Sequence, residues 1–218
     1  MEIGEMLGDS FEYTREGLMG KWKKWLLLII CYIIFPLIGG YVVRIYKGAR
    51  PAPEVDDWVG MFIDGIKLLI IGFVYALPVL LVGAVLIGGS VLAFSTGDSA
   101  ANVAGVGMLL LGLLVVFILA ILISLIATLG MVRFARKDSM GEAFNFGAIM
   151  ETIGNIGWVE YIIALIVLWI VMLVVQFILG FFMSIPLIGW IIGLFIGPAL
   201  AIFSARYMTI LYESGTPA

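Results

Sequence analysis

Long apolar runs dominate the pattern of residues along this chain. Four of them reach or exceed the roughly 20 residues that an α-helix needs to cross a hydrocarbon core, and they cover residues 66–95, 103–132, 158–183 and 185–212. Pro186 and Pro198 predict a kink in the last of these runs. The pattern therefore predicts an all-α fold, a polytopic transmembrane helix bundle with interfacial amphipathic helices, which forms a single membrane domain.

A fifth apolar run lies within residues 25–47, and the sequence FPLIGG interrupts its middle. Two interpretations remain open: a re-entrant hairpin of two short helices hinged at Pro36, Gly39 and Gly40, or one kinked span. Irregular backbone at membrane depth is tolerated only where neighbouring protein covers it. We favour the hairpin and expect it to pack against the long spans.

The positions of lysine and arginine favour one orientation, because cytoplasmic loops of membrane proteins are enriched in these residues. They occur before residue 25, between residues 44 and 67, and just after residue 132. All three clusters reach the same side when the segment 25–47 enters and leaves by one face of the membrane. We therefore expect both termini to be cytoplasmic. The polar segment 1–24 is expected to be cytoplasmic or interfacial, and it lacks the apolar core of a removable signal peptide.

The most polar stretch between spans is RPAPEVDDWVGMFIDGIK, residues 50–67. It predicts an amphipathic surface helix over residues 53–65, with Pro53 in the first turn, where a missing N–H costs little. At 100° per residue one face is apolar, with Val55, Trp58, Val59, Phe62 and Ile66. Trp58 is expected at headgroup depth, and the helix is expected to run straight into the span at residue 66.

A second surface segment is predicted over residues 139–155. Ser139 and Glu142 stand at the spacing of a capping box at its start. Apolar side chains at positions 146, 149, 150 and 153 share one face of the predicted helix.

The polar face of the first surface helix is acidic, whereas helices that lie on a membrane are normally basic on that face. Anionic headgroups repel carboxylates, so positive side chains are expected nearby. The resulting candidate salt-bridge or partner-docking site comprises Asp56, Asp57, Trp58, Asp64, Arg44, Arg133 and Arg206. We hypothesise that one or more of these acids pairs with one or more of these arginines and holds the helix to the bundle. The alternative, that the arginines extend to lipid headgroups and the acids are solvated, remains open. A catalytic acid pair fits least.

Composition identifies the solvent as lipid. The chain of 218 residues is 63% hydrophobic and 12% charged, with a mean hydropathy of +1.20. It has one cysteine and no histidine, which argues against nitrogen- and sulfur-ligated metals, and we expect no cofactor. A formal net charge of −3 argues against a nucleic-acid partner. The expected partners are membrane lipids, with a homo-oligomer and an unknown protein partner left open.

Intramembrane polar residues are the default indicators of function, and here they are sparse. Gln176 is the only strongly polar side chain deep in a predicted span and is the candidate intramembrane polar site. Two function classes remain. The first is a non-enzymatic scaffold, a helix bundle that interacts with lipids or a partner. The second is a transporter or channel for a small apolar or amphipathic solute. No nucleophile, base or metal set can be assembled, so an enzyme is not expected.

Three stretches carry a resemblance to a known family: GGYVVRIYKG (39–48), PAPEVDDWVGMFIDGIK (51–67) and ARKDSMGEAFNFGAIM (135–150). The chain resembles the archaeal multi-pass membrane proteins described as domain of unknown function 4013. In these proteins a glycine-tyrosine step, as at Tyr41, leads through an arginine into a proline-acid-tryptophan stretch. The resemblance implies an archaeal origin and a cell-membrane location, and it supplies no mechanism.

Overall fold

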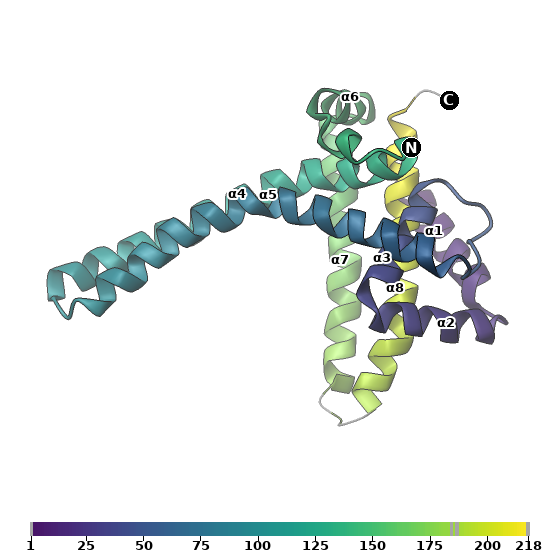
Figure 1. Cartoon of the computed structure of the whole chain (residues 1–218), viewed down its shortest axis with the longest axis horizontal. Coiled ribbons are helices and arrows are strands. Elements are labelled where there is room, and N and C mark those ends of the chain that lie inside the picture. The colour runs from purple at the N-terminus through teal and green to yellow at the C-terminus, as the bar shows by residue number, and fades with distance from the viewer. Residues whose placement is uncertain (1, 184, 186–187, 217–218) are drawn as a thin grey trace. The chain divides into compact units, whose positions relative to one another are not determined.

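A computed structural model of the chain describes residues 2–183, 185 and 188–216. Over these residues the chain is helical (Figure 1), with α1 (Ile3–Leu18), α2 (Trp22–Ile33), α3 (Phe35–Tyr46), α4 (Trp58–Ser95), α5 (Ser99–Lys137), a 3-10 turn (Met140–Phe144), α6 (Phe146–Ile156), α7 (Trp158–Met183) and α8 (Ile188–Ser214). The predicted all-α class is confirmed. Among the described residues α4, α5, α7 and α8 are long and apolar enough to cross a membrane. The predicted turn near residue 184 and Pro186 lie outside the described residues.

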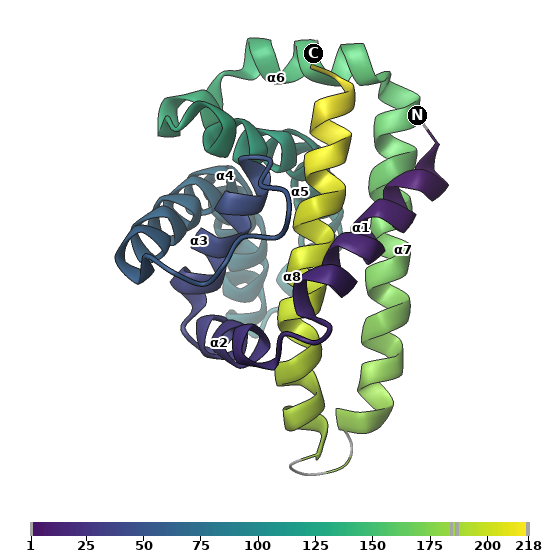
Figure 2. The same ribbon diagram turned by 90° about the vertical axis from the view of Figure 1, so that its right-hand side faces the viewer.

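The chain divides into two compact units, Met1–Leu69 with Leu129–Ala218 (unit 1) and Ile70–Thr128 (unit 2). In unit 1, α7 and α8 lie side by side, and α1 crosses them (Figure 2). The short helices α2 and α3 also pack on α8, and α6 lies beside α7 and the C-terminal end of α8. Helix α8 is thus the common contact surface of unit 1.

The core of unit 1 forms where α2 and α3 meet α8. Leu28 and Cys31 from α2, Tyr41 from α3 and Ile202 from α8 are fully buried there. The segment 25–47 thus packs against one of the long helices, as expected for irregular backbone that needs protein cover.

Helices α2 and α3 are separate, and the break between them lies at Ile34. The predicted hinge at Pro36, Gly39 and Gly40 is therefore wrong. Pro36 is the second residue of α3, a position where its missing N–H would have no helical partner in any case. The two glycines do not bend the chain and lie within α3. They allow another helix to approach α3 closely.

That close approach is between α3 and the first turns of α4. A Cβ atom at position 40 would lie 1.8 Å from the carbonyl oxygen of Met61, and one at position 65 would lie 1.7 Å from the carbonyl oxygen of Pro36. Backbone therefore packs directly on backbone at both points, which only glycine permits.

The surface helix predicted over residues 53–65 begins later, at Trp58, and continues without a break to Ser95. Residues 53–57 are not helical. The helix does not form there because side chains from α2 and α3 bind the carbonyl groups of this stretch. In addition, Asp57 caps the N-terminus of α4, so the helix starts only after it. Trp58, Val59 and Phe62 are all exposed on the first turns of α4.

The second surface segment, predicted over residues 139–155, is a 3-10 turn followed by α6. Ser139 makes no capping hydrogen bond, so the predicted capping box is wrong. Asn145 caps α6 instead, since its side-chain oxygen accepts from the Ala148 N–H at 3.3 Å. Glu142 points to Arg133 and not back to the backbone of residue 139.

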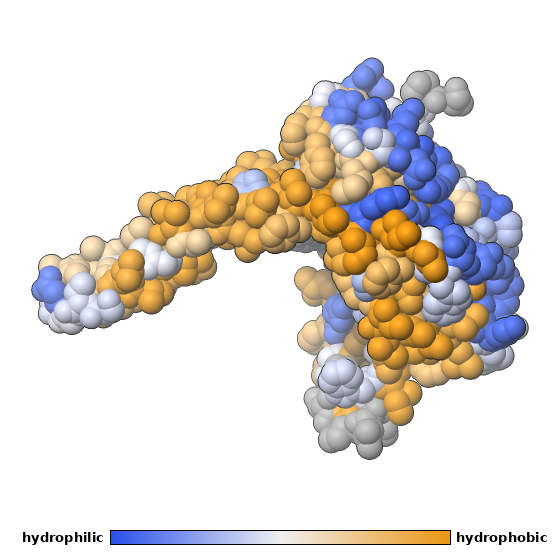
Figure 3. Space-filling model, viewed as in Figure 1, coloured by the Kyte–Doolittle hydropathy of each residue, from blue (hydrophilic) through white to orange (hydrophobic). Residues whose placement is uncertain are grey.

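Unit 2 is an antiparallel pair of apolar helices, residues 70–95 of α4 and 99–128 of α5. Asp98 is its only charged residue, and its carboxylate accepts from the N–H of Ala101 (3.3 Å) at the start of α5. Small residues let the helices approach, for instance at Gly112, where a Cβ would lie 2.9 Å from that of Leu86. Apart from its polar tip, the surface of this pair is apolar (Figure 3). Helices that are apolar on all sides are typical of a lipid environment.

Substitution of Gly40 by alanine tests the contact between α3 and α4. Alanine normally stabilises a helix relative to glycine by up to about 1 kcal/mol. Here its Cβ would overlap the Met61 carbonyl, so Gly40→Ala is expected to lower the free energy of unfolding by about 1–3 kcal/mol or more. Thermal unfolding of the full chain in detergent measures the effect.

The matched control is Gly8→Ala, because Gly8 lies in α1 and nothing lies within 4 Å of a Cβ there. That variant is expected to unfold at the wild-type temperature or slightly above it. A Gly40→Ala protein as stable as the Gly8→Ala protein would contradict the close packing.

Candidate functional site

The extended stretch that leads into α4 is held by side chains from α2 and α3. Lys24 donates from Nζ to the carbonyl oxygen of Ala52 at 2.9 Å, and Tyr41 donates from its hydroxyl to that of Pro53 at 2.8 Å. Lys24 is almost fully buried, and burial lowers its pKa from the ordinary value. These bonds satisfy carbonyl groups that the helix predicted over this stretch would have used internally.

Arg44, on α3, makes further contacts with the extended stretch before α4. Its guanidinium lies 2.5 Å from the carboxylate of Asp56 and 3.6 Å from that of Asp57, and it donates to the carbonyl oxygens of Glu54 (3.2 Å) and Asp56 (3.0 Å). We refer to Arg44, Asp56 and Asp57 as the Arg44 cluster. Both aspartates are exposed, so each ion pair alone contributes at most about 1 kcal/mol. The bonds to carbonyl oxygens add to this and bring α3 and the stretch before α4 together.

Asp57 also caps α4. Its Oδ1 accepts from the N–H of Gly60 at 3.1 Å, three residues further on, in the manner of a helix N-cap. Its φ angle is +44°, in the left-handed region that aspartate and asparagine tolerate better than most residues. Asp57 is thus held both by Arg44 and by the helix that it begins.

The third predicted acid, Asp64, pairs with lysines. It lies 3.7 Å from Lys47 and 3.0 Å from Lys67, and Lys47 reaches Asp138 at 3.2 Å. The contact with Lys47 joins α4 to the end of α3. Lysines, and not the expected arginines, are therefore the partners of Asp64.

Arg133 does not meet any of the three predicted acids. It pairs with Glu142 at 2.6 Å, and hydrogen bonding from the Arg133 side chain lowers the pKa of Glu142. Of the three candidate arginines, Arg133 is therefore not one that pairs with these acids, because the chain folds back after α5 and brings Glu142, nine residues further on, to it. This contact fixes the 3-10 turn to the end of α5.

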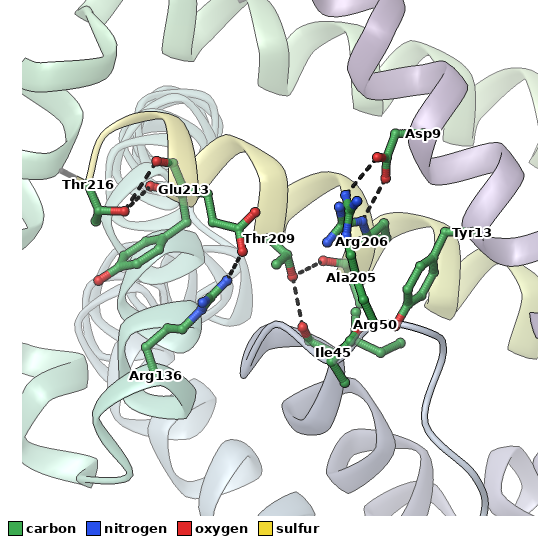
Figure 4. A network of polar contacts seen from close by, with 12 residues as sticks. Asp9, Tyr13, Ile45, Arg50, Arg136, Ala205, Arg206, Thr209, Glu213 and Thr216 are labelled. Atoms are coloured by element: carbon green, nitrogen blue, oxygen red, sulfur yellow. Dashed lines mark hydrogen bonds and ion pairs between the residues drawn. The ribbon is translucent and has the colours of Figure 1, made fainter. Parts of the chain in front are cut away.

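Arg206 also finds a different partner, on a helix that the apolar pattern did not predict. Its Nε lies 2.7 Å from Asp9 on α1, and the other carboxylate oxygen of Asp9 accepts from Arg50 at 2.7 Å (Figure 4). The Tyr13 ring lies 5.3 Å from the Arg206 guanidinium carbon, a cation–π contact. The Arg206 side chain is only 1% exposed. A buried charge of this kind requires such partners.

The same network continues along α8. Thr209 donates to the carbonyl oxygen of Ile45 at the end of α3 at 3.2 Å, and Arg136 pairs with Glu213 (Figure 4). Tyr13 donates to the carbonyl oxygen of Ala49 at 2.9 Å, and burial raises its pKa to about 12. Side chains of α8 therefore bind α1, α3 and the end of α5.

The apolar pattern does not single out Asp9 and Tyr13, and the capping-box spacing predicts a different role for Glu142 from the ion pair that it forms. One signal for α1 was present: its buried residues include Met6, Ser10, Tyr13 and Gly17, spaced three or four apart, which is the period of an amphipathic helix. The acidic side chains between them hide this pattern, because they make the segment polar as a whole.

Gln176, the predicted intramembrane polar residue, lines a cavity of about 340 Å³ between α7 and α8. Tyr32 of α2 lines it too, with Trp190, Gly193 and Gly197 of α8. We call it the Gln176 pocket. The Tyr32 ring lies against Gly197, where a Cβ would be 2.5 Å from it. A polar side chain at this depth is thus placed in a cavity formed by three helices.

A second cavity, of about 410 Å³, lies beside the first and shares Leu200 with it. Its lining is apolar and comes from α1, α7, α8 and Trp25 of α2. We call it the apolar pocket. Within the described residues, no group of three or more carboxylate or thiol side chains is placed to hold a metal ion.

The profile of a protein family of unknown function, DUF4013, matches residues 25–184, more than half of the chain. The chain belongs to this family. No curated protein and no solved structure matches it. In this DUF4013 protein the matched region contains the Arg44 cluster, Arg133 and Gln176, whereas Asp9 and Arg206 lie outside it.

Two substitutions at Asp57 and one at Asp56 separate the roles of Asp57 in this DUF4013 protein. Asp57→Ala removes the cap and disfavours the positive φ, so we expect it to lower the free energy of unfolding by about 1–3 kcal/mol. Asp57→Asn keeps the cap and removes only the charge, so it is expected to cost less than about 1 kcal/mol. Asp56→Ala, the matched control without a capping role, is expected to cost as little as Asp57→Asn. Thermal unfolding compares them, and equal losses for the alanine and asparagine variants of Asp57 would exclude the capping role.

Proposed function

We propose that this chain is a non-enzymatic scaffold of the cell membrane, in an archaeon as the family resemblance implies, whose unit 1 interacts with membrane lipids. The observation that carries the proposal is the separation of charge. Every ion pair found among the described residues belongs to unit 1, whereas residues 70–128 contain a single charged side chain. A unit held together by ion pairs, in the same chain as long apolar helices, suits a protein that is anchored in a membrane.

The roles of the polar residues support a structural function over a catalytic one. The carboxylates of Asp56 and Asp57 bind Arg44, and that of Asp9 binds Arg50 and Arg206. These pairs join separate segments of unit 1. A scaffold requires such contacts to keep its surface in one conformation. Catalysis by the same carboxylates would require them to leave these ion pairs.

The orientation follows from the basic residues. Lys24, Arg44 and Arg133 all belong to unit 1 and flank apolar segments, and such residues favour the cytoplasmic side. We therefore propose that both termini and the Arg44 cluster face the cytoplasm, with the tip of unit 2 on the opposite side of the membrane.

Cysteine labelling tests this topology. In a Cys31→Ser background, single cysteines are introduced as Glu12→Cys, Gly141→Cys and Asp98→Cys, all at exposed positions. A membrane-impermeant maleimide applied to sealed cells is expected to label only the Asp98→Cys protein, and applied to inverted vesicles only the other two. Labelling of the proteins with Glu12→Cys and Gly141→Cys from opposite sides would refute the proposed orientation.

A second candidate function, transport of a small amphipathic solute, is favoured by the Gln176 pocket. A cavity that combines an amide, a tyrosine and glycine-rich α8 can hold a molecule within the bilayer, as broken helices do in transporters. Among the described lining residues, Gln176, Tyr32 and Trp190 are the ones whose side chains carry polar groups, which would select a solute with few polar groups.

Reconstitution distinguishes the two functions. The full chain is placed in phosphatidylglycerol vesicles that contain a trapped amphipathic dye, and parallel samples are extracted for native mass spectrometry. A lipid-interacting scaffold is expected to retain phospholipid after extraction and to leave the dye efflux rate at that of protein-free vesicles. Efflux that rises with the wild-type chain and falls with Gln176→Ala would replace the scaffold by the transporter. Loss of all phospholipid on extraction would refute the scaffold's lipid interaction.

A further inference from the structure

The apolar pocket is the cavity of unit 1 whose use the charged network leaves open. Its walls come from four helices, with Leu18 from α1, Trp25 from α2, Val171 from α7, and Ala199 and Phe203 from α8. At about 410 Å³ it falls within the size range of small-molecule sites, roughly 300–1,000 Å³. A single hydrocarbon chain is the kind of group that such a lining accommodates.

Specific contacts fix the helices that form these walls. The indole of Trp25 donates to the carbonyl oxygen of Phe195 at 3.0 Å, close to Pro198, where the helix lacks one N–H donor. Trp22 stacks on Trp25 with 5.5 Å between ring centroids. On the other side, the pairing of Asp9 with Arg206 holds α1 against α8. Directional bonds therefore fix α1 and α2 relative to α8. We infer that α1 does not move inward to fill the pocket.

The open side of the pocket is apolar with a basic edge. Phe11 and Met19, which line it, are both more than 60% exposed, and Arg15 lines it as well. Two exposed lysines, Lys21 and Lys23, follow Met19 closely in sequence and line another cavity, which Glu54 also lines. An apolar cavity with cations along one edge complements a molecule with a hydrocarbon chain and an anionic head.

Acidic side chains of α1 line a different cavity, and the one that reaches Arg15 would compete only weakly with an anionic ligand. Asp9, Glu12 and Glu16 line a separate polar cavity with Tyr13 and Arg50. Glu12 does pair with Arg15 at 3.1 Å, but both side chains are at least half exposed, and such pairs are weak. A phosphate can therefore displace the Glu12 carboxylate from Arg15.

We propose that the apolar pocket binds one hydrocarbon chain of an anionic phospholipid, whose phosphate is held by Arg15, Lys21 and Lys23. This inference rests on the proposed lipid-interacting function and gives it a site and a ligand class. The lipid would occupy the corner where α1 and α2 meet α7 and α8, and would bridge helices that the charged network connects only at its polar end.

The test measures phospholipid retained by the detergent-extracted full chain after exposure to vesicles of phosphatidylglycerol or phosphatidylcholine. The wild type is expected to retain phosphatidylglycerol in clear preference to phosphatidylcholine. Ala199→Phe, which fills the pocket, is expected to reduce retained phosphatidylglycerol about tenfold, equivalent to 1.4 kcal/mol of binding free energy. Ala104→Phe, at an exposed position of α5 in unit 2, is the matched control and is expected to behave as wild type.

The charge half of the proposal has its own pair of variants. Arg15→Gln combined with Lys21→Gln is expected to bring retention of the two lipids close together, whereas Lys137→Gln, an exposed lysine after the α5 span, is expected to leave the preference unchanged. Equal retention of both lipids by the wild type would overturn the anionic ligand.

Photolabelling keeps the test independent of whether Ala199→Phe folds. A phosphatidylglycerol with a diazirine on one chain is expected to label Phe11, Met19 or Val171 of the wild-type protein. Labelling confined to residues 70–128, or an unchanged phosphatidylglycerol signal in a folded Ala199→Phe protein, would overturn the site while leaving the proposed function standing. A wild type that retains no phospholipid at all would overturn both.

Discussion

A charged side chain enters a hydrocarbon phase only at high cost unless it is paired, and this constraint organises unit 1. Arg206 is the clearest case, because its side chain is buried and lies on a helix that is apolar enough to cross a membrane. Its pairing with Asp9 requires a segment from the other end of the chain to pack across α8. The position of α1, and with it one wall of both the polar and the apolar cavities, follows from the need to neutralise this one arginine.

The same reasoning extends from charges to backbone carbonyl groups. The stretch before α4 lacks helical hydrogen bonds, and Lys24, Tyr41 and Arg44 replace them from neighbouring helices. Because every residue type carries a carbonyl group, these contacts do not depend on the side chains of the residues that they hold. Glycine at positions 40 and 65 then allows α3 and α4 to meet backbone to backbone, so that the donors are within reach. The contact of α3 with α4 therefore depends both on close backbone packing and on the hydrogen bonds to the carbonyl groups before α4.

Length and apolar content were sufficient to predict the four long helices, because a span needs a continuous run and nothing else. They were insufficient for the start of α4, since a helical projection of residues 53–57 assumes a helix and takes no account of side chains that bind its carbonyls. Pairing was harder still. Arg44 lies 12 residues from Asp56, whereas Arg206 lies 197 residues from Asp9, and no local pattern ranks partners across such a separation. The segment that supplies Asp9 is expected from its charges to be cytoplasmic or interfacial, and these charges conceal the apolar face by which it packs.

The two cavities along α7 and α8 acquire a common explanation from this arrangement. Helix α8 must carry polar contacts near its C-terminal end, at Arg206 and Thr209, and it must remain apolar where it faces lipid. Between these regions Gly193, Gly197 and Ala199 leave little side-chain volume beside Pro198, while the large rings of Trp25 and Tyr32 approach only part of that surface. Space is left on either side of Leu200. The proposed binding of a lipid chain would fill the space on one side of Leu200, so that the small residues of α8 would set a lipid contact in the same way as they set its protein contacts.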